Sequence, residues 1–208
     1  MYYAADKPHG LAFDPFKAII APRPIGWIST LDKNGIANLA PYSFFNALTS
    51  SPPMLMFSSE SLKDSAGNAR DTGEFSFSLA THPLQTEMNI SSDTLPPEQS
   101  EYEAARLDMA PCNLISAPRV AASPASMECV TLSCTELKDK DGQPVNTFMV
   151  IGQVVGIHIN DDFIVDGRFD TAAAQPLARC GYRDYAAVHE TFELMRPTDG
   201  GTYTGVDR

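Results

Sequence analysis

Lysine and asparagine side chains stand near the start of one short predicted helix, where they could bind a phosphate. Lys63 precedes a helix expected over Asp64–Thr72, and Asn68 lies in its first half. Arg23 and Arg70 could add positive charge. The unpaired amides and the dipole of a helix N-terminus stabilise an anion by ~0.3–1 kcal/mol before any charge-assisted hydrogen bond forms. A solvated helix end with ordinary surface charges explains the same spacing equally well.

Hydroxyl side chains favour the phosphate interpretation over the solvated helix end. They occur at three places in the sequence that, in a barrel, could converge on the same end of the molecule: Ser29, Thr30, Ser43, Ser58 and Ser59. Hydroxyl groups and free amides together are suited to a phosphate, so this end of the chain is the leading candidate for an anion site.

Aromatic residues in the same part of the chain could form a wall against a planar ring. They are Trp27, Tyr42, Phe44 and Phe45. Their default interpretation is barrel core, in which Tyr42 fits least well because its hydroxyl needs a hydrogen-bond partner. Periodicity leaves both interpretations open.

Acidic residues, histidines and cysteines carry weaker signals. Asp139 and Asp141 flank a predicted turn, but a calcium loop needs further oxygen ligands that the sequence lacks at that spacing. Cys129 and Cys134 would face opposite sides of one strand, which disfavours a shared disulfide or metal, so no metal site is predicted. His158 ends a long predicted strand, where it could face a pocket as a catalytic or cofactor-contacting residue.

Predicted strands must position these side chains. An Asn-Gly turn between the apolar runs 25–31 and 36–40 predicts a hairpin, and a second hairpin joins 127–138 to 146–159. Strict alternation over Glu74–Leu79 predicts a strand with one face in solvent. The alternating strand and helix pattern of a parallel sheet is missing, as are the glycine-rich nucleotide motifs, so the chain is expected to be mainly β, an antiparallel barrel or sandwich with a few peripheral helices.

The rest of the chain is expected to be connections. Residues 41–53 are predicted to form an aromatic and hydroxyl-rich loop. Residues 82–126 interrupt the strands as an excursion with helices near 84–90 and 101–107, and the chain from about 197 is Gly-rich and expected to be loose. We expect residues 1–208 to form a single domain.

Composition excludes several classes of function. The 208 residues are 43% hydrophobic, enough for a substantial core, and the net charge of -11 would repel a nucleic-acid backbone. No apolar run approaches the ~20 residues needed to span a bilayer, and the first residues lack the features of a signal peptide. We therefore expect a cytoplasmic protein that binds neither nucleic acid nor membrane.

Five motifs follow one another along the chain: PRPIGWIST at 22–30, N-x-APYSFFNALTSSPPM at 38–54, KDSAGNARDTGEF at 63–75, VIGQVVGIHI at 150–159 and PLARCGYRDY at 176–185. Taken together and in this order, they resemble the flavin reductase-like family of FMN-binding split β-barrel proteins, in the subgroup of flavoredoxin and the reductase component of nitrilotriacetate monooxygenase. The resemblance implies an antiparallel Greek-key split barrel.

The same resemblance implies a homodimer with FMN in a cleft at the subunit interface. It places near the flavin ring the residues Ser29, Thr30, Ala40, Pro41, Tyr42, Ser43 and Asn46. Around the ribityl phosphate it places Ser58, Ser59, Lys63, Asp64 and Asn68. It also implies that His158, Arg179 and Tyr182 reach the cleft from its other side or from the other subunit. One departure is that Cys180-Gly181-Tyr182 stands where family members commonly carry Leu-Gly-Gly.

The implied activity is an NAD(P)H-dependent flavin reductase that transfers a hydride to flavin N5, with a partner oxygenase or another redox protein as acceptor. Two alternatives stay open at this point. The protein could be an FMN-containing electron carrier reduced by a separate protein, or a dimeric split barrel that has lost its cofactor.

Overall fold

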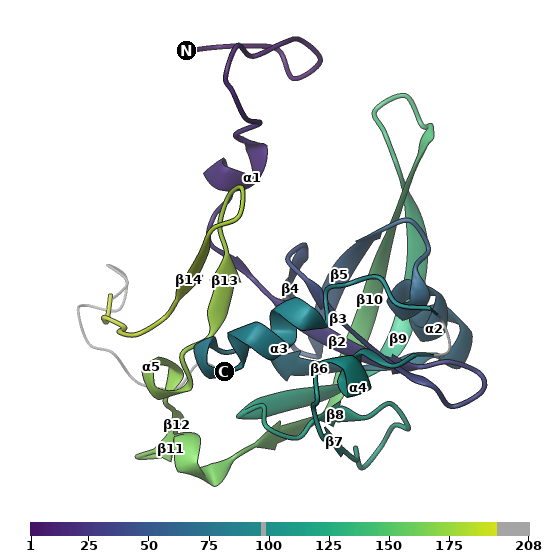
Figure 1. Ribbon diagram of the computed structural model, residues 1–208, viewed down its shortest axis with the longest axis vertical. Helices are drawn as coiled ribbons and strands as arrows, with labels where there is room; N and C mark the ends of the chain where they lie inside the picture. Colours follow the sequence, from purple (N-terminus) through teal and green to yellow (C-terminus); the bar gives the residue numbers. More distant parts are fainter. Residues whose placement is uncertain (97–98, 195–208) are drawn as a thin grey trace.

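A curved antiparallel sheet forms the body of the protein, which we describe from a computed structural model covering residues 1–96 and 99–194 (Figure 1). Its seven strands follow the order β3-β2-β6-β9-β10-β5-β4, and every neighbouring pair is antiparallel. The strands are β2 (Gly26–Leu31), β3 (Ala37–Tyr42), β4 (Phe45–Ser50), β5 (Pro53–Glu60), β6 (Glu74–Leu79), β9 (Ala125–Lys138) and β10 (Pro144–Ile159). The prediction of a mainly β, antiparallel fold is confirmed. The tail expected from about residue 197 lies outside the described residues.

Short elements surround this sheet. The helices are α1 (Phe16–Ile19), α2 (Asp64–Thr72), η1 (His82–Leu84), α3 (Gln85–Ile90), α4 (Glu101–Ala104), η2 (Asp161–Phe163) and α5 (Thr171–Ala174). The small strands are β1 (Arg23–Pro24), β7 (Met109–Ala110), β8 (Arg119–Val120), β11 (Ile164–Val165), β12 (Arg168–Phe169), β13 (Leu177–Arg179) and β14 (Tyr185–Ala187). Within the described ranges, none of the helices has both the length and the apolar character required to cross a bilayer.

The turn of the first hairpin and the end of α2 form as the sequence predicts. In the first hairpin the Asp32 carboxylate accepts hydrogen bonds from the amides of Asn34 and Ile36, and Gly35 adopts a φ of +84°. Helix α2 ends at Gly73, whose left-handed conformation lets its amide bond to Ala69 O. The first hairpin and α2 are therefore confirmed.

The predicted loop over 41–53 is wrong, because most of it is strand. β3 continues to Tyr42 and β4 begins at Phe45, which pairs with Phe57 of β5. The Phe45 ring stacks on Phe77 at 4.9 Å between centroids, and Gly26 makes room for it, since a Cβ there would lie 2.3 Å from the ring. Packing across the sheet thus turned an aromatic run into a core strand.

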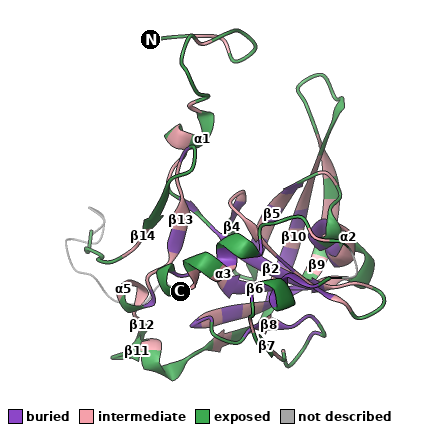
Figure 2. Cartoon of the chain, in the orientation of Figure 1, coloured by how far each residue is buried: buried purple, intermediate pink, exposed green. Residues whose placement is uncertain are grey.

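Two clusters of buried side chains hold the fold together. The first lies between the sheet and α2 and includes Phe57, Phe75 and Val150. The second lies on the other side of β2 and β3, where Trp27 is fully buried and donates its indole N–H to Ser91 Oγ at 2.9 Å. Figure 2 shows this burial concentrated in the central strands, whereas the N-terminal arm (residues 1–20) and the tip of the β9–β10 hairpin project from the body and are largely exposed.

The expectation that β6 has one face in solvent is wrong. Ser76 and Ser78 point away from the aromatic core, yet both are buried because the segment 112–124 covers them. Ser76 Oγ donates to Pro118 O, and the amide of Val120 donates to Ser78 Oγ at 3.1 Å. The segment 112–124, which contains Pro118 and Pro124, therefore covers this face of the sheet.

The prediction that Cys129 and Cys134 face opposite sides is also wrong. Cys129 belongs to the first buried cluster, and Cys134 packs against the same cluster. In β9 the partners of Ile151 and Gly152 are Ser133 and Thr131, so one extra residue is inserted between the two cysteines. This β-bulge reverses the alternation beyond it. Both thiols are free.

The Glu128 carboxylate ties the covering segment to β9. Its Oε1 accepts from the amide of Asn113 at 2.8 Å and pairs with His158 Nε2 at 2.6 Å, and its Oε2 accepts from the amide of Leu114 at 2.6 Å. Burial by itself would raise the pKa of Glu128, but these amides and His158 outweigh it and hold the pKa below its ordinary value.

We expect Glu128→Gln to lower the free energy of unfolding by about 1–3 kcal/mol, because a neutral amide replaces a buried acceptor of charge-assisted hydrogen bonds. A carboxylate with a lowered pKa stabilises the fold above its unfolded pKa, near 4.5, and loses that contribution as the pH falls through the folded pKa. The difference between wild type and variant should therefore be full at pH 6–8 and shrink below about pH 4.5.

Urea unfolding at several pH values measures this difference. Glu103→Gln is the matched control, because Glu103 is exposed on α4 and the same substitution there should change stability by less than about 0.5 kcal/mol. Equal stability of the Glu128→Gln protein and the control at pH 7 would contradict the prediction.

Candidate functional site

A cavity of about 400 Å³ opens where β3 ends, beside β5 and the first turn of α2. This volume is in the range of small-molecule sites. We call it the main cavity. Nine residues that the sequence analysis selected line it: Ala40, Pro41, Tyr42, Ser43, Phe44, Ser58, Ser59, Lys63 and Asp64. The fold therefore brings the predicted ring contacts and the predicted phosphate contacts together.

The N-terminus of α2 forms one side of the main cavity. Its N-cap is Lys63, whose side chain cannot accept a hydrogen bond, and no side chain caps the helix. The amides of the first turn are consequently available to an external acceptor. Lys63, Asp64 and Ser65 all line the cavity, so this end of the helix is open to a ligand.

Ser59 on β5 presents an unsatisfied hydroxyl at the same place. The residue is 1% exposed, and its Oγ, although close to the Tyr42 hydroxyl, makes no hydrogen bond of ordinary geometry with a described residue. A buried polar group without a partner is costly, and buried polar groups usually have one. A ligand with hydrogen-bonding oxygens at this end of the cavity would supply the missing partner.

Glu101 and Ser65 support the cavity and were missed by the sequence analysis. The buried Glu101 carboxylate accepts from Asn38 Nδ2 at 3.0 Å and from the amide of Leu39 at 2.9 Å. Ser65 Oγ donates to Asn38 Oδ1 at 2.7 Å. Burial raises the pKa of Glu101 above its ordinary value although these donors oppose the shift. No local pattern could have found Glu101, because it lies 63 residues from Asn38 and only packing brings them together.

Other lining residues were also missed. The segment 91–95 after α3 closes one side, and Glu60 and Asp93 contribute carboxylates. The lining cations are Lys17 and Lys63. The main cavity is therefore not uniformly positive, and its end near Lys63 and the open helix terminus suits an anionic group best.

Four of the predicted ring and phosphate contacts are absent from the lining of the main cavity. The side chains of Ser29 and Thr30 are fully buried in β2, and Asn68 Nδ2 donates to Thr30 Oγ1 at 3.2 Å. Asn46 is exposed on β4, where its side chain accepts from the amide of Ala47. None of these four lines the main cavity. Their direct contact with a ligand stays a prediction.

Tyr42 behaves as a mixed core and cavity residue. Its ring lies 4.8 Å from the Phe57 ring, between centroids, while the residue also lines the main cavity. Burial raises the pKa of Tyr42, so its hydroxyl stays protonated at neutral pH. The two interpretations of the aromatic run both apply to this residue.

His158 lies apart from the main cavity within this chain. Its Nε2 pairs with the Glu128 carboxylate on the covered face of the sheet, and its side chain is 20% exposed. Cys112 Sγ lies within 4.8 Å of these two groups. Because the Glu128 oxygens already bond to three amides and to His158, this cluster is explained by its structural role. A catalytic role of His158 in a second subunit's cleft stays a prediction.

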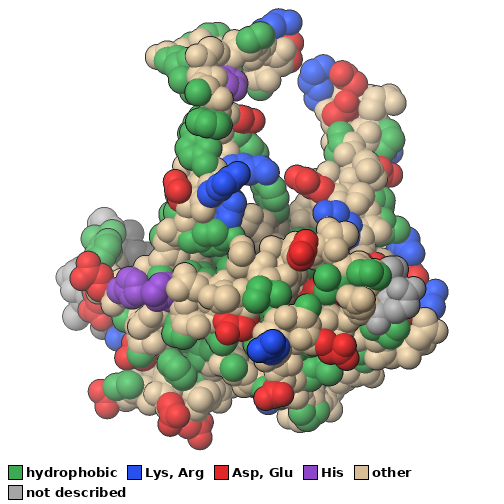
Figure 3. All heavy atoms as spheres, viewed as in Figure 1, with side chains coloured by type: hydrophobic (Ala, Val, Ile, Leu, Met, Phe, Trp, Pro, Cys, Tyr) green, Lys and Arg blue, Asp and Glu red, His purple; other side chains and the backbone are tan. Residues whose placement is uncertain are grey.

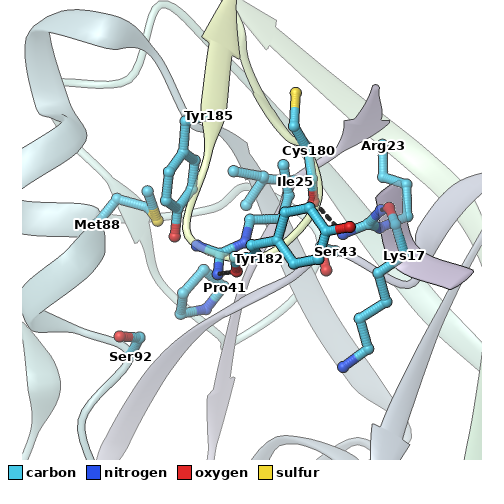
Figure 4. Close-up of a pocket in the computed structure, with 11 residues that line it drawn as sticks. Lys17, Arg23, Ile25, Pro41, Ser43, Met88, Ser92, Cys180, Tyr182 and Tyr185 are labelled. Carbon is cyan, nitrogen blue, oxygen red and sulfur yellow. Dashed lines mark hydrogen bonds between the residues drawn. The ribbon is translucent and has the colours of Figure 1, made fainter. Parts of the chain in front are cut away.

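Arg179 and Tyr182 line a second cavity of about 310 Å³ that adjoins the main cavity (Figure 4). We call it the cationic cavity. The two cavities share the lining residues Lys17, Pro41, Ser43 and Ser92. The structure therefore brings Arg179 and Tyr182 to the end of β3 within one chain, and no second subunit is needed for this placement.

Known proteins resemble this chain in both sequence and fold. The flavin reductase like domain matches residues 20–173. An uncharacterized protein of Halalkalibacterium halodurans is 38% identical over 184 residues, which are 86% of this chain and 88% of that protein. The crystal structure of nitrilotriacetate monooxygenase component B from Bacillus cereus is 29% identical, with a TM-score of 0.81 over 90% of this chain and 100% of that one.

A structure from Shewanella frigidimarina whose name includes a split barrel domain is 21% identical and has a TM-score of 0.78. It covers 87% of this chain and 89% of that chain. At this identity the likeness concerns the fold alone, and it confirms the split-barrel prediction. With the match over residues 20–173, the chain belongs to the flavin reductase-like family.

Proposed function

We propose that this protein binds FMN in the main cavity and acts as an NAD(P)H-dependent flavin reductase. The observation that carries the proposal is the uncapped N-terminus of α2, which opens into the cavity beside the unpaired Ser59 hydroxyl. Amides and a hydroxyl without partners are the donors that a phosphate group requires. Family membership supports a flavin as the molecule that carries this phosphate.

Different lining residues would contact different polar groups of the cofactor. Ser58, Ser59, Lys63 and the first-turn amides of α2 would hold the phosphate, and the backbone and side chains of 40–43 would hold the edge of the ring. Glu60 and Asp93 would repel a phosphate, but their carboxylates suit the hydroxyl groups of the ribityl chain, which donate hydrogen bonds. The part of the main cavity near Lys63 thus suits the phosphate of FMN, and the acidic part suits the ribityl chain.

Bound FMN would supply the redox chemistry, by accepting a hydride from NAD(P)H at N5. The role of the chain is then to bind and orient both molecules and to limit the access of water. A side chain that acts as acid or base is not required. In the same proposal, the electron acceptor is an oxygenase or another redox protein, and both proteins are in the cytoplasm.

A homodimer completes the proposal. Large apolar side chains are exposed on the β9–β10 hairpin, where Leu132 is 51% and Ile157 57% exposed, and on the N-terminal arm, where Phe16 is 55% and Ile19 74% exposed. Exposed apolar groups of this size on strands β9 and β10 and on the projecting arm are typical of a protein interface. In a symmetric dimer each arm and each hairpin would cover the other subunit.

We expect Ser59→Ala to separate cofactor binding from folding. Removing an unpaired buried hydroxyl should leave the free energy of unfolding of the flavin-free protein unchanged or raise it by up to about 1 kcal/mol. The dissociation constant for FMN should rise about 5- to 10-fold, because a hydrogen bond of about 1 kcal/mol is lost. Fluorescence titration of FMN and urea unfolding measure the two quantities.

Ser76→Ala is the matched control for Ser59→Ala. Ser76 is equally buried but donates to Pro118 O within the fold. The control should therefore lose about 1 kcal/mol of stability and keep its FMN affinity. Unchanged FMN affinity in Ser59→Ala would place the phosphate elsewhere.

Stopped-flow absorbance tests the reductase activity. When FMN-loaded protein is mixed anaerobically with excess NADH or NADPH, we expect at least one nucleotide to bleach the visible flavin band at roughly 1–1,000 s⁻¹, the range of ordinary enzyme turnover. Absence of bleaching with both nucleotides would sink the reductase proposal and leave FMN binding intact. Fast reduction by a protein donor in that case would support an electron carrier.

Sedimentation velocity tests the homodimer. We expect the wild-type protein to sediment as a dimer at micromolar concentration, and Ile157→Lys to raise the dissociation constant of the dimer at least 10-fold, since a buried unpaired charge is costly at an interface. Lys33→Glu, an exposed change in the turn of the first hairpin, should leave the dimer intact. A wild-type monomer at 50 to 100 micromolar, roughly the weak end of specific association, would contradict the proposal.

A further inference from the structure

The cationic cavity holds three positive side chains and no carboxylate. Lys17, Arg23 and Arg179 line it, and none of its lining residues is acidic. In the described part of the chain, none of the three lies within ion-pair distance of an Asp or Glu. The protein has 26 acidic residues against 15 Lys and Arg, so the absence of acids around three clustered cations calls for an anion from outside the chain.

Arg23 is fixed in the wall of this cavity. The residue is 7% exposed, and its guanidinium donates to Lys17 O. A second hydrogen bond runs from Nη2 to Cys180 O at 2.9 Å. Its Nε is buried and has no acceptor among the described residues. Backbone carbonyls thus hold the positive charge in place without neutralising it, and a buried charge of this kind favours a counter-ion.

Arg179 and Lys17 face the same space and keep free donors. The Arg179 guanidinium lies 4.3 Å from the centroid of the Tyr185 ring and gives one hydrogen bond, from Nη2 to Tyr182 O at 2.7 Å. Its other nitrogens are available, as is the exposed Lys17 ammonium. Figure 4 shows Lys17 and Arg23 at the cavity with the rings of Tyr182 and Tyr185, and Figure 3 shows Lys and Arg gathered below the N-terminal arm.

Tyr182 occupies an unfavourable backbone conformation at the edge of the cavity. Its φ is +55°, which lies in a region that residues other than glycine rarely adopt. The preceding Gly181 packs so closely against α1 that a Cβ there would lie 2.4 Å from Ala18 Cβ. A tyrosine ring held at this position in spite of its backbone is consistent with a role in contacting a ligand.

We propose that the cationic cavity binds the carboxylate or phosphate group of the second reactant, the molecule that exchanges electrons with the flavin. This inference rests on the proposed function, because it places FMN in the main cavity. Pro41 and Ser43 line both cavities, so a molecule anchored by Lys17 and Arg179 would lie beside the flavin. Guanidinium groups bind carboxylates and phosphates through paired hydrogen bonds, and tyrosine rings pack against flat molecules.

Two sources could supply such an anion: the phosphates of a nicotinamide dinucleotide, or the carboxylate of a small aromatic substrate. Isothermal titration calorimetry with FMN-loaded protein distinguishes them, because FMN then fills the phosphate site of the main cavity. The probes are inorganic pyrophosphate, benzoate and the neutral analogue benzamide. We expect at least one anion to bind 10-fold or more tightly than benzamide. Tighter binding of pyrophosphate indicates the dinucleotide, and tighter binding of benzoate indicates the carboxylate.

Substitutions test the assignment of the site. Arg179→Gln and, separately, Lys17→Gln should each weaken binding of the preferred anion at least 10-fold. Lys33→Gln removes the same charge from an exposed lysine that pairs with Asp71, and it should change binding less than 2-fold. Lys17 is exposed, so its variant keeps the test valid if Arg179→Gln does not fold. Anion binding no tighter than that of benzamide, or equal in the Lys17 and Lys33 variants, would overturn the proposal.

Tyr182→Gly gives a readout that a structural role would not produce. Glycine suits the positive φ, so the variant should be at least as stable as wild type in urea unfolding, while the ring contact is lost and benzoate or pyrophosphate binding weakens at least 3-fold. Unchanged binding would exclude the ring from the site. The same titrations with flavin-free protein separate the two proposals, since anion binding without FMN binding would overturn the proposed function alone.

Discussion

A buried carboxylate anchors the first half of β3, and both cavities open where this strand ends. Glu101 bonds to the side chain of Asn38 and to the amide of Leu39, and Asn38 in turn bonds to Ser65 of α2. One side chain from α4 thus fixes the distance between an edge strand and the helix whose N-terminus opens into the main cavity. An edge strand has one unpaired side, and here the carboxylate takes the place of a neighbouring strand at the amide of Leu39.

Carboxylates also bond to backbone amides on the opposite side of the sheet. Glu128 accepts three backbone amides from 113–115, and Glu74 accepts the amides of Ser116 and Ala117. A carboxylate can satisfy several amides at once, so it can hold an irregular segment that has no strand partners. The irregular cover of the sheet is thus ordered by acids, which explains part of the acidic composition without reference to any ligand.

Positive charge is distributed in a different way. Among the described residues, the cations around the cationic cavity make no ion pair with an acid that could neutralise them. In a chain with a net charge of -11, such a local excess of positive charge attracts small anions while the surface as a whole repels polyanions. The location of the charge therefore says more about function than its total.

The sequence by itself determined the local elements and which residues belong to the site. The Asn-Gly turn, the glycine that ends α2 and the long β9–β10 hairpin follow from short-range chemistry, and nine lining residues of the main cavity lie in motifs that resemble those of one family. Only the tertiary structure decided which of those residues face the cavity. Packing of Phe45 on Phe77 made a strand of the predicted loop, a bulge in β9 brought Cys129 and Cys134 to one side, and Glu101 reached Asn38 across 63 residues. These outcomes depend on contacts between distant parts of the chain, and local patterns carry no information about such contacts.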